Sequence, residues 1–164
     1  MSQSTFTLTS DHLGGQATAQ EIFNGFGCEG SNVSPQLSWK NAPAGTKSFA
    51  LTMYDPAAPT GSGWWHWVMF NIPATTVELA QGAGAREKGL APEGSIQSLN
   101  DYGQKGYGGP CPPEGDEPHP YIITIHALSV EQLDLSEDIN PAQAGFNING
   151  NTLAKASLVM YHRR

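Results

Sequence analysis

Apolar and polar side chains alternate along several short stretches of the chain, which is the pattern of β-strands with one buried face. In residues 48–54, Phe49, Leu51 and Met53 fall on one side of the extended chain. Residues 65–72 and 121–128 are apolar on both sides, which favours central strands buried on both faces. The pattern predicts strands at residues 6–9, 36–39, 48–54, 65–72, 121–128 and 156–161.

Helix signals are sparse, and long loops separate the predicted strands. Asn140 followed by Pro141 is typical of the start of a short helix, while Gly145 and Gly150 weaken any long one. The stretches 55–64 and 100–120 are rich in Gly and Pro and end on buried strands. Loops of this length in a compact domain are usually functional or disordered.

Composition supports the same fold class. Gly (19) and Pro (12) together make up nearly a fifth of the 164 residues, so turns must be abundant. The length suits one domain with one core. We therefore expect a mostly β protein with a few short helices, organised as a single domain over residues 1–164.

Charge narrows the class of partner. Eight Lys and Arg against fifteen Asp and Glu give a formal net charge of -7, and the basic residues are scattered apart from the terminal Arg163 and Arg164. This distribution argues against a broad surface for nucleic acid or an anionic membrane. Any anion must be held locally, by a few groups in a concave site.

The sequence gives little sign of export or membrane insertion. No run approaches the roughly 18 apolar residues of a membrane-spanning helix, and residues 1–10 lack the pattern of a signal peptide. We expect a cytoplasmic protein, or a periplasmic one if the chain is a trimmed precursor.

Two cysteines, Cys28 and Cys111, lie in separate Gly-rich loops. They are too few and too far apart for a paired C-x-x-C metal cluster. For a cytoplasmic protein we favour two unpaired thiols, and a disulfide that clamps the two loops together is the alternative.

The first long loop joins two residues whose side chains are candidates for a functional site. Asp55 closes one predicted strand and His66 opens the next, so a hairpin-like return places both at one end of the sheet. A carboxylate beside an imidazole favours the protonated ring and fixes its orientation. An Asp in a turn and a core His remain the simpler local interpretation.

The second long loop delivers another histidine to an apolar strand. His119 stands between Pro118 and Pro120, which restrict its backbone. Two histidines that each follow a loop rich in Gly and Pro suggest a shared site. The neighbouring aromatic residues mostly suit core packing: strict alternation places Trp65 and Trp67 opposite His66, while Trp64 and Tyr107 could wall a pocket.

Other chemistries fit less well. The Gly-x-Ser-x-Gly elbow, the phosphate-binding loop and the His-Glu-x-x-His zinc motif are all missing from the sequence. The glycine-rich stretch from Gly103 to Gly109 does not match the dinucleotide fingerprint. A metal triad of Asp55, His66 and His119 is a remote alternative, and we expect no cofactor.

At these residues the sequence resembles the phosphatidylethanolamine-binding protein (PEBP) family, in particular its bacterial branch of Raf-kinase-inhibitor-like proteins. The family's Asp-Pro-Asp-Ala-Pro motif corresponds to residues 55–59, followed by Trp64-Trp65-His66-Trp67 and Asn71-Ile72-Pro73. The second motif, Gly-x-x-Pro-Pro-x-Gly before His-Arg-Tyr, corresponds to residues 109–115 and 119–121. Asn32-Val33-Ser34-Pro35 and residues 43–48 also match, so the resemblance covers nearly the whole chain.

The resemblance implies a Greek-key sandwich of antiparallel sheets and a pocket for phosphate, acetate or a phosphorylethanolamine head group. It also implies backbone N–H donors in the loop from Gly109 to Pro112 and a cis peptide before Pro59. A homodimer would follow by analogy with bacterial relatives. The implied ligand-binding residues are Asp55, His66, Gly109, Cys111, Pro113, His119 and Tyr121.

Two positions depart from the family motifs. Ala57 replaces the second Asp of the first motif, which should make the pocket less negative. Pro120 replaces the Arg between His119 and Tyr121, which should remove a structural ion pair. Both departures leave the two histidines in place.

Three functions remain in competition. The leading hypothesis is a non-enzymatic module that binds phosphate or carboxylate groups through protonated imidazole and loop N–H groups. The second is a regulatory protein that docks on a kinase, protease or other partner through the same pocket. The third is a metal-dependent or acid–base enzyme built on the Asp and His residues.

Overall fold

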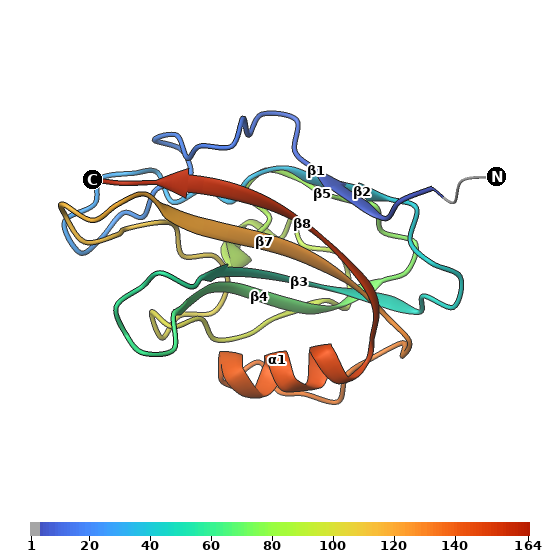
Figure 1. The fold of residues 1–164 in the computed structure, drawn as a ribbon. Helices are drawn as coiled ribbons and strands as arrows, with labels where there is room; N and C mark the ends of the chain where they lie inside the picture. The colour runs from blue at the N-terminus through green and yellow to red at the C-terminus, as the bar shows by residue number, and fades with distance from the viewer. Residues whose placement is uncertain (1–3) are drawn as a thin grey trace.

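Two antiparallel sheets form the body of the protein, which a computed structural model describes for residues 4–164 (Figure 1). The larger sheet has the strand order β6 (Ile96–Gln97), β4 (Trp64–Pro73), β3 (Ser48–Asp55), β7 (His119–Leu128) and β8 (Thr152–His162). The smaller sheet has the order β1 (Thr7–Thr9), β2 (Leu37–Lys40) and β5 (Glu78–Leu79). The helical elements are η1 (Arg86–Lys88) and α1 (Pro141–Gly150).

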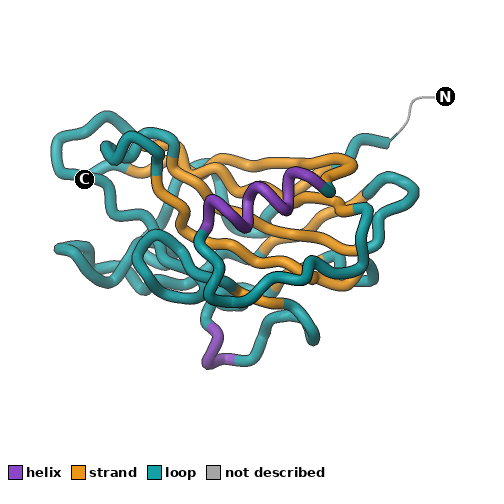
Figure 2. The backbone as a smooth tube through the Cα atoms, turned by 90° about the horizontal axis from the view of Figure 1, so that it is seen from below, coloured by secondary structure: helices purple, strands orange, loops and turns teal. Residues whose placement is uncertain are grey.

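These elements stack as three layers with a core on each side of the large sheet. The inner core fills the space between the sheets, where Leu37 and Trp39 of β2 pack with Met53 and Trp67. The second core lies on the opposite face, where Phe70 and its neighbours are covered by Ala144 and Ile148 of α1. Seen from below, α1 lies across the face of the large sheet (Figure 2). Because both faces are covered, β3 and β4 are buried along almost their whole length.

The helix begins where the sequence predicts. The Asn140 side chain accepts a hydrogen bond from the Gln143 N–H at 2.8 Å, and Pro141 occupies the first turn. The helix continues through Gly145 and ends at Gly150, because packing of its apolar face against β4 outweighs the low helix propensity of glycine.

The predicted mostly β class is confirmed, and each of the predicted strands is present. The largest difference in a boundary is at β8, which begins at Thr152 rather than at residue 156. The prediction missed β5 and β6, because a strand of two residues is too short to show alternation. Within residues 4–164, no helix is long and apolar enough to cross a membrane.

Sheet pairing brings the two long loops together. β3 lies between β4 and β7 and is antiparallel to both. The end of β3 at Asp55 therefore adjoins the beginning of β4 and the beginning of β7. As a result, His66 and His119 reach the same end of the large sheet.

Candidate functional site

A cavity of about 190 Å³ opens at this end of the large sheet. Its floor is polar, and its walls and rim are mostly aromatic or proline side chains. Strand ends supply the floor, while the loops before and after them supply the walls. The lining consists of Phe26, Asp55, Ala58, Pro59, Thr60, Trp64, His66, Tyr102, Cys111, Pro112, Pro113, His119 and Tyr121.

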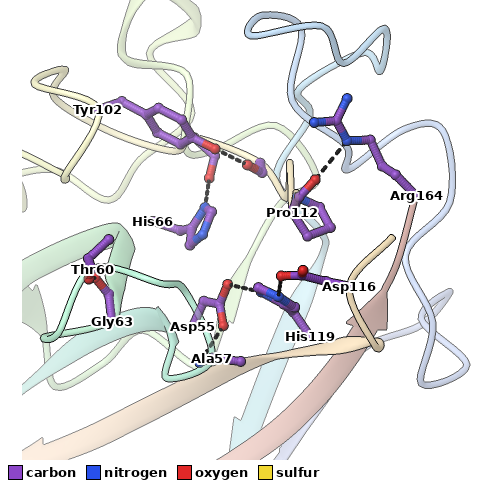
Figure 3. Close-up of polar contacts among 12 residues, drawn as sticks. Asp55, Ala57, Thr60, Gly63, His66, Tyr102, Pro112, Asp116, His119 and Arg164 are labelled. Carbon is purple, nitrogen blue, oxygen red and sulfur yellow. Dashed lines mark hydrogen bonds and ion pairs between the residues drawn. The ribbon is translucent and has the colours of Figure 1, made fainter. Parts of the chain in front are cut away.

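His119 lies between two carboxylates on this floor (Figure 3). Its Nδ1 is 2.7 Å from Asp55 Oδ2, and its Nε2 is 2.8 Å from Asp116 Oδ2. Burial opposes the charged ring, but the hydrogen bonds to Asp55 and Asp116 prevail and raise the pKa of His119 above its ordinary value. The ring is therefore a buried imidazolium that donates from both nitrogens.

Asp55 is fixed at the end of β3. Its Oδ1 accepts a hydrogen bond from the Ala57 N–H at 2.8 Å, and its side chain is only 3% exposed. The prediction that Asp55 and His66 lie at one end of the sheet is confirmed, but the prediction that Asp55 favours a protonated His66 ring is wrong. Asp55 instead holds His119, because β7 brings the His119 ring to the other side of the strand end.

His66 is neutral and is held by a backbone carbonyl. Its Nδ1 lies 2.7 Å from the Gly108 oxygen and donates to it, so Nε2 is left as an acceptor. Burial lowers the pKa of His66 to about 4, and the nearby hydrogen bond and the charge of Asp55 only partly oppose this shift. The pKa values of the two histidines are therefore shifted in opposite directions.

A β-bulge explains how His66 reaches the cavity. Tyr54 pairs with Trp65 while Met53 pairs with Trp67, so His66 is an extra residue in β4. The bulge turns His66 and Trp67 toward the same side. The expectation that Trp67 lies opposite His66 is therefore wrong, whereas Trp65 does pack on the far face.

Two tyrosine rings flank His66. The rings of Tyr102 and Tyr121 meet the imidazole edge to face, with centroids at 5.6 and 5.0 Å. Burial raises the pKa of both tyrosines, so each hydroxyl keeps its proton. Tyr102 donates to the Gly109 oxygen at 2.8 Å, and Tyr121 is buried and lines the cavity.

Gly109 does not line the cavity, although it was among the expected site residues. Its N–H donates to Asn32 Oδ1 at 2.7 Å and so is not free for a ligand. A side chain at this position would collide with the Glu21 carbonyl oxygen, so glycine allows the two loops to approach. Of residues 110–113, only Cys111 carries an N–H, because the other three are prolines.

Cys28 and Cys111 form a disulfide, contrary to the favoured expectation of two free thiols. The bond joins the loop that carries Phe26 to the wall of the cavity. The alternative, a disulfide that clamps the two loops together, is therefore confirmed, although proximity between residues 83 positions apart depends on the fold.

Three residues at the site were missed by the sequence analysis. Phe26 lies at the rim with 74% of its surface exposed, and its φ of 52° is unusual for a bulky residue. Tyr102 packs between Phe26 and Trp64. Asp116 was read only as part of a Pro-rich loop, and no local pattern marks it as the second partner of His119.

The remaining expectations have mixed outcomes. Trp64 lines the cavity as suggested, but Tyr107 is buried elsewhere and donates to the Glu21 oxygen. The peptide before Pro59 is trans, not cis, the form that X–Pro bonds favour unless their surroundings impose the other. Within residues 4–164, no three His, Cys, Asp or Glu side chains are arranged to hold a metal ion.

The chain matches the family model described as phosphatidylethanolamine-binding protein over residues 14–163. It is 48% identical over 155 residues to the UPF0098 protein YbcL of Escherichia coli, covering 93% of this chain and 85% of YbcL. It is 50% identical over 139 residues to YbhB of the same organism, covering 85% of this chain and 87% of YbhB. The crystal structure of YbcL, described as a new member of the mammalian PEBP family, matches with a TM-score of 0.95 at 45% identity. That match covers 98% of this chain and 99% of the chain in the YbcL crystal structure.

Proposed function

Because the chain belongs to the phosphatidylethanolamine-binding protein family, we propose that its cavity binds a small molecule with an anionic group without catalysing a reaction. The observation that carries this proposal is the buried His119 imidazolium at the floor of an open cavity. A buried charged ring can give an anion a charge-assisted hydrogen bond that water screens less than at an exposed site.

Other groups on the floor supply the remaining contacts. The Tyr121 hydroxyl and the Cys111 N–H can donate to further oxygens of the anion. The Nε2 of neutral His66 can accept from a protonated oxygen or an ammonium group, and the Asp55 carboxylate also suits an ammonium group. A phosphorylethanolamine head group carries both kinds of charge, and simple phosphate or a carboxylate would use the donors alone.

The walls of the cavity favour a ligand that also has an apolar part. Phe26, Pro59, Trp64 and Pro112 surround the polar floor. They exclude water from one side of the anion, which strengthens its hydrogen bonds. The cavity of about 190 Å³ is large enough for a group of head-group size.

We further propose a binding role because the ring of His119 is poorly placed for acid–base catalysis. The imidazolium carries a proton on each nitrogen, so it has no lone pair with which to take a proton from a substrate. Docking of a protein partner that carries a phosphorylated or acidic side chain would use the same floor, and it remains a prediction.

The disulfide suggests where the protein works. Disulfides persist in oxidising compartments and are rare in the cytosol. We therefore propose the periplasm or another oxidising compartment in place of the expected cytoplasm. Counting the free thiols of the denatured protein, purified from its native source, tests this location. Two free thiols per chain would contradict it.

Titration with inorganic phosphate tests the binding role. We expect phosphate to shift the side-chain NMR signals of His119 and His66, with an affinity that weakens as pH rises through the raised pKa of His119. His119→Gln should lose most of the affinity. His126→Gln is the matched control, since His126 is buried on the other face of β7. Equal affinity in the two variants, or no dependence on pH, would reject the proposal.

A further inference from the structure

The two carboxylates that hold His119 are held very differently themselves. Asp55 ends β3, has a second hydrogen bond from the Ala57 N–H and is 3% exposed. The side chain of Asp116 is 40% exposed and bonds only to the His119 ring among residues 4–164. One carboxylate belongs to the rigid sheet, and the other can leave for water.

The backbone around Asp116 is also loosely attached. The Asp116 N–H donates to the Pro113 oxygen at 3.4 Å, and the Gly115 N–H donates to the Arg164 oxygen at 3.5 Å, both of which are long for hydrogen bonds. Gly115 has a φ of 86°, and nothing lies within contact distance of the place where a side chain would stand. A small movement of this turn would withdraw the carboxylate from the ring.

The contact from Asp116 occupies a donor that an anionic ligand needs. With both ring nitrogens bonded, His119 has no N–H to offer to an incoming oxygen. Asp55 cannot give way, because its departure would leave a buried charge without a partner. The Nε2 proton is therefore available only when Asp116 moves.

We propose that Asp116 is a built-in competing anion, whose carboxylate occupies the His119 Nε2 proton and is displaced by the oxygen of a ligand (Figure 3). This inference rests on the proposed function and specifies how the same site is regulated. The tethered carboxylate competes at a high effective concentration, so it weakens the affinity of every anion that uses this proton.

Charge is balanced during this exchange. With Asp116 in place, His119 carries one positive charge between two negative ones, and the group as a whole repels a further anion. When the ligand replaces Asp116, one anion replaces another at the ring. Arg164 and Glu114 also lie nearby and interact with each other at 3.6 Å, and Glu117 is exposed in the same loop. Burial lowers the pKa of His66 and of His162, which pairs with His119 from β8. The exchange therefore avoids two anions on the same nitrogen.

Affinities of sodium phosphate and sodium acetate for three variants test the inference. Asp116→Asn removes the charge, Asp116→Ala removes the acceptor as well, and Glu117→Gln removes an exposed carboxylate from the same loop without touching His119. Calorimetry or NMR should be run at about pH 5.5, below the ordinary histidine pKa of about 6.5, so that His119 is charged throughout.

We expect both Asp116 variants to bind each anion about tenfold more tightly than the natural protein, since a charge-assisted competitor is lost. The factor should be the same for phosphate and acetate, because both anions need the same proton, and Glu117→Gln should change neither affinity. Unchanged or weaker binding in the Asp116 variants, beside measurable phosphate binding by the natural protein, would overturn the inference alone. Failure of all these proteins to bind either anion would overturn the proposed function with it.

Discussion

His66 and His119 occupy similar positions in the fold and have opposite protonation. Each ring lies near the start of a strand that pairs with β3, each follows a loop rich in Gly and Pro, and each is almost completely buried. Yet His119 donates to two carboxylates, whereas His66 donates to the Gly108 carbonyl. Burial disfavours the charge on both rings, and only a carboxylate partner overcomes it.

This comparison shows that the charge of a buried histidine depends more on its hydrogen-bond partner than on how deeply it is buried. A carbonyl oxygen fixes which nitrogen carries the proton but supplies too little charge to hold a second one. The floor therefore has one permanent donor group and one permanent acceptor group side by side. The site thus has two parts, His119 with its carboxylates and His66 with the Gly108 carbonyl. Experiments that change one partner at a time test the two parts separately.

The largest expected effect comes from removing the disulfide, which anchors the loop that carries Gly108, the partner of His66. Cys28→Ser with Cys111→Ser should lower the free energy of unfolding by about 4 kcal/mol, since the bond closes a long loop in the unfolded chain. It should also loosen the loop that carries Gly108, so the pKa of His66 should rise from about 4 toward 6.5.

Urea denaturation and an NMR titration of the histidines measure both effects. The pKa of His119 should stay above 6.5, because Asp55 belongs to β3 and not to that loop. The natural protein treated with a reductant is the control. It should show the same changes if they come from the loss of the disulfide and not from the serine side chains. Equal changes in the pKa values of His66 and His119 would show that the two histidines are not held independently.

A slightly smaller effect is expected from removing the carboxylate that holds His119. Asp55→Asn should lower the free energy of unfolding by about 3 kcal/mol near pH 6, because a buried charge loses its buried partner. The pKa of His119 should fall because it loses a hydrogen bond and a charge, and the pKa of His66 should fall less because it loses only the nearby charge of Asp55. Asp116→Asn is the matched comparison and should change stability by less than about 1 kcal/mol, since its pair is partly exposed. Similar losses for both variants would show that Asp55 is not the principal partner.

The sequence predicted the general fold well because strand patterning is local. Alternation at residues 48–54 and continuous apolar stretches at 65–72 and 121–128 mark the three central strands. The ends of these strands then place Asp55, His66 and His119 at one edge of the sheet. Six of the seven expected site residues do line one cavity, and Gly109 is the exception.

What the sequence could not predict depends on geometry between distant residues. The bulge at His66 is invisible to a pattern of strict alternation, and it reverses which side Trp67 faces. The pairing of Asp55 with His119 depends on which neighbour of β3 brings its ring closer. Asp116 and the disulfide likewise required the loops to be folded in space.

The smallest expected effect concerns His66 and the loss of stability in acid. The pKa of His66 is about 4 in the folded protein and about 6.5 in the unfolded chain, so below pH 6.5 the unfolded chain binds a proton that the folded protein does not. His66 therefore contributes stability above pH 6.5 that is lost as pH falls toward 4. Between about pH 7 and pH 5 this loss should be about 2 kcal/mol.

His66→Asn removes this titration while its side-chain amide can still donate to the Gly108 oxygen, as Nδ1 of the ring does. Urea denaturation at several pH values should give a flatter profile than that of the natural protein by about 2 kcal/mol between about pH 7 and pH 5. His126→Gln should flatten the profile by a similar amount, since burial also lowers the pKa of His126 to about 4. A profile for His66→Asn parallel to that of the natural protein would mean that His66 is already charged, and the contrast between the two histidines would be lost.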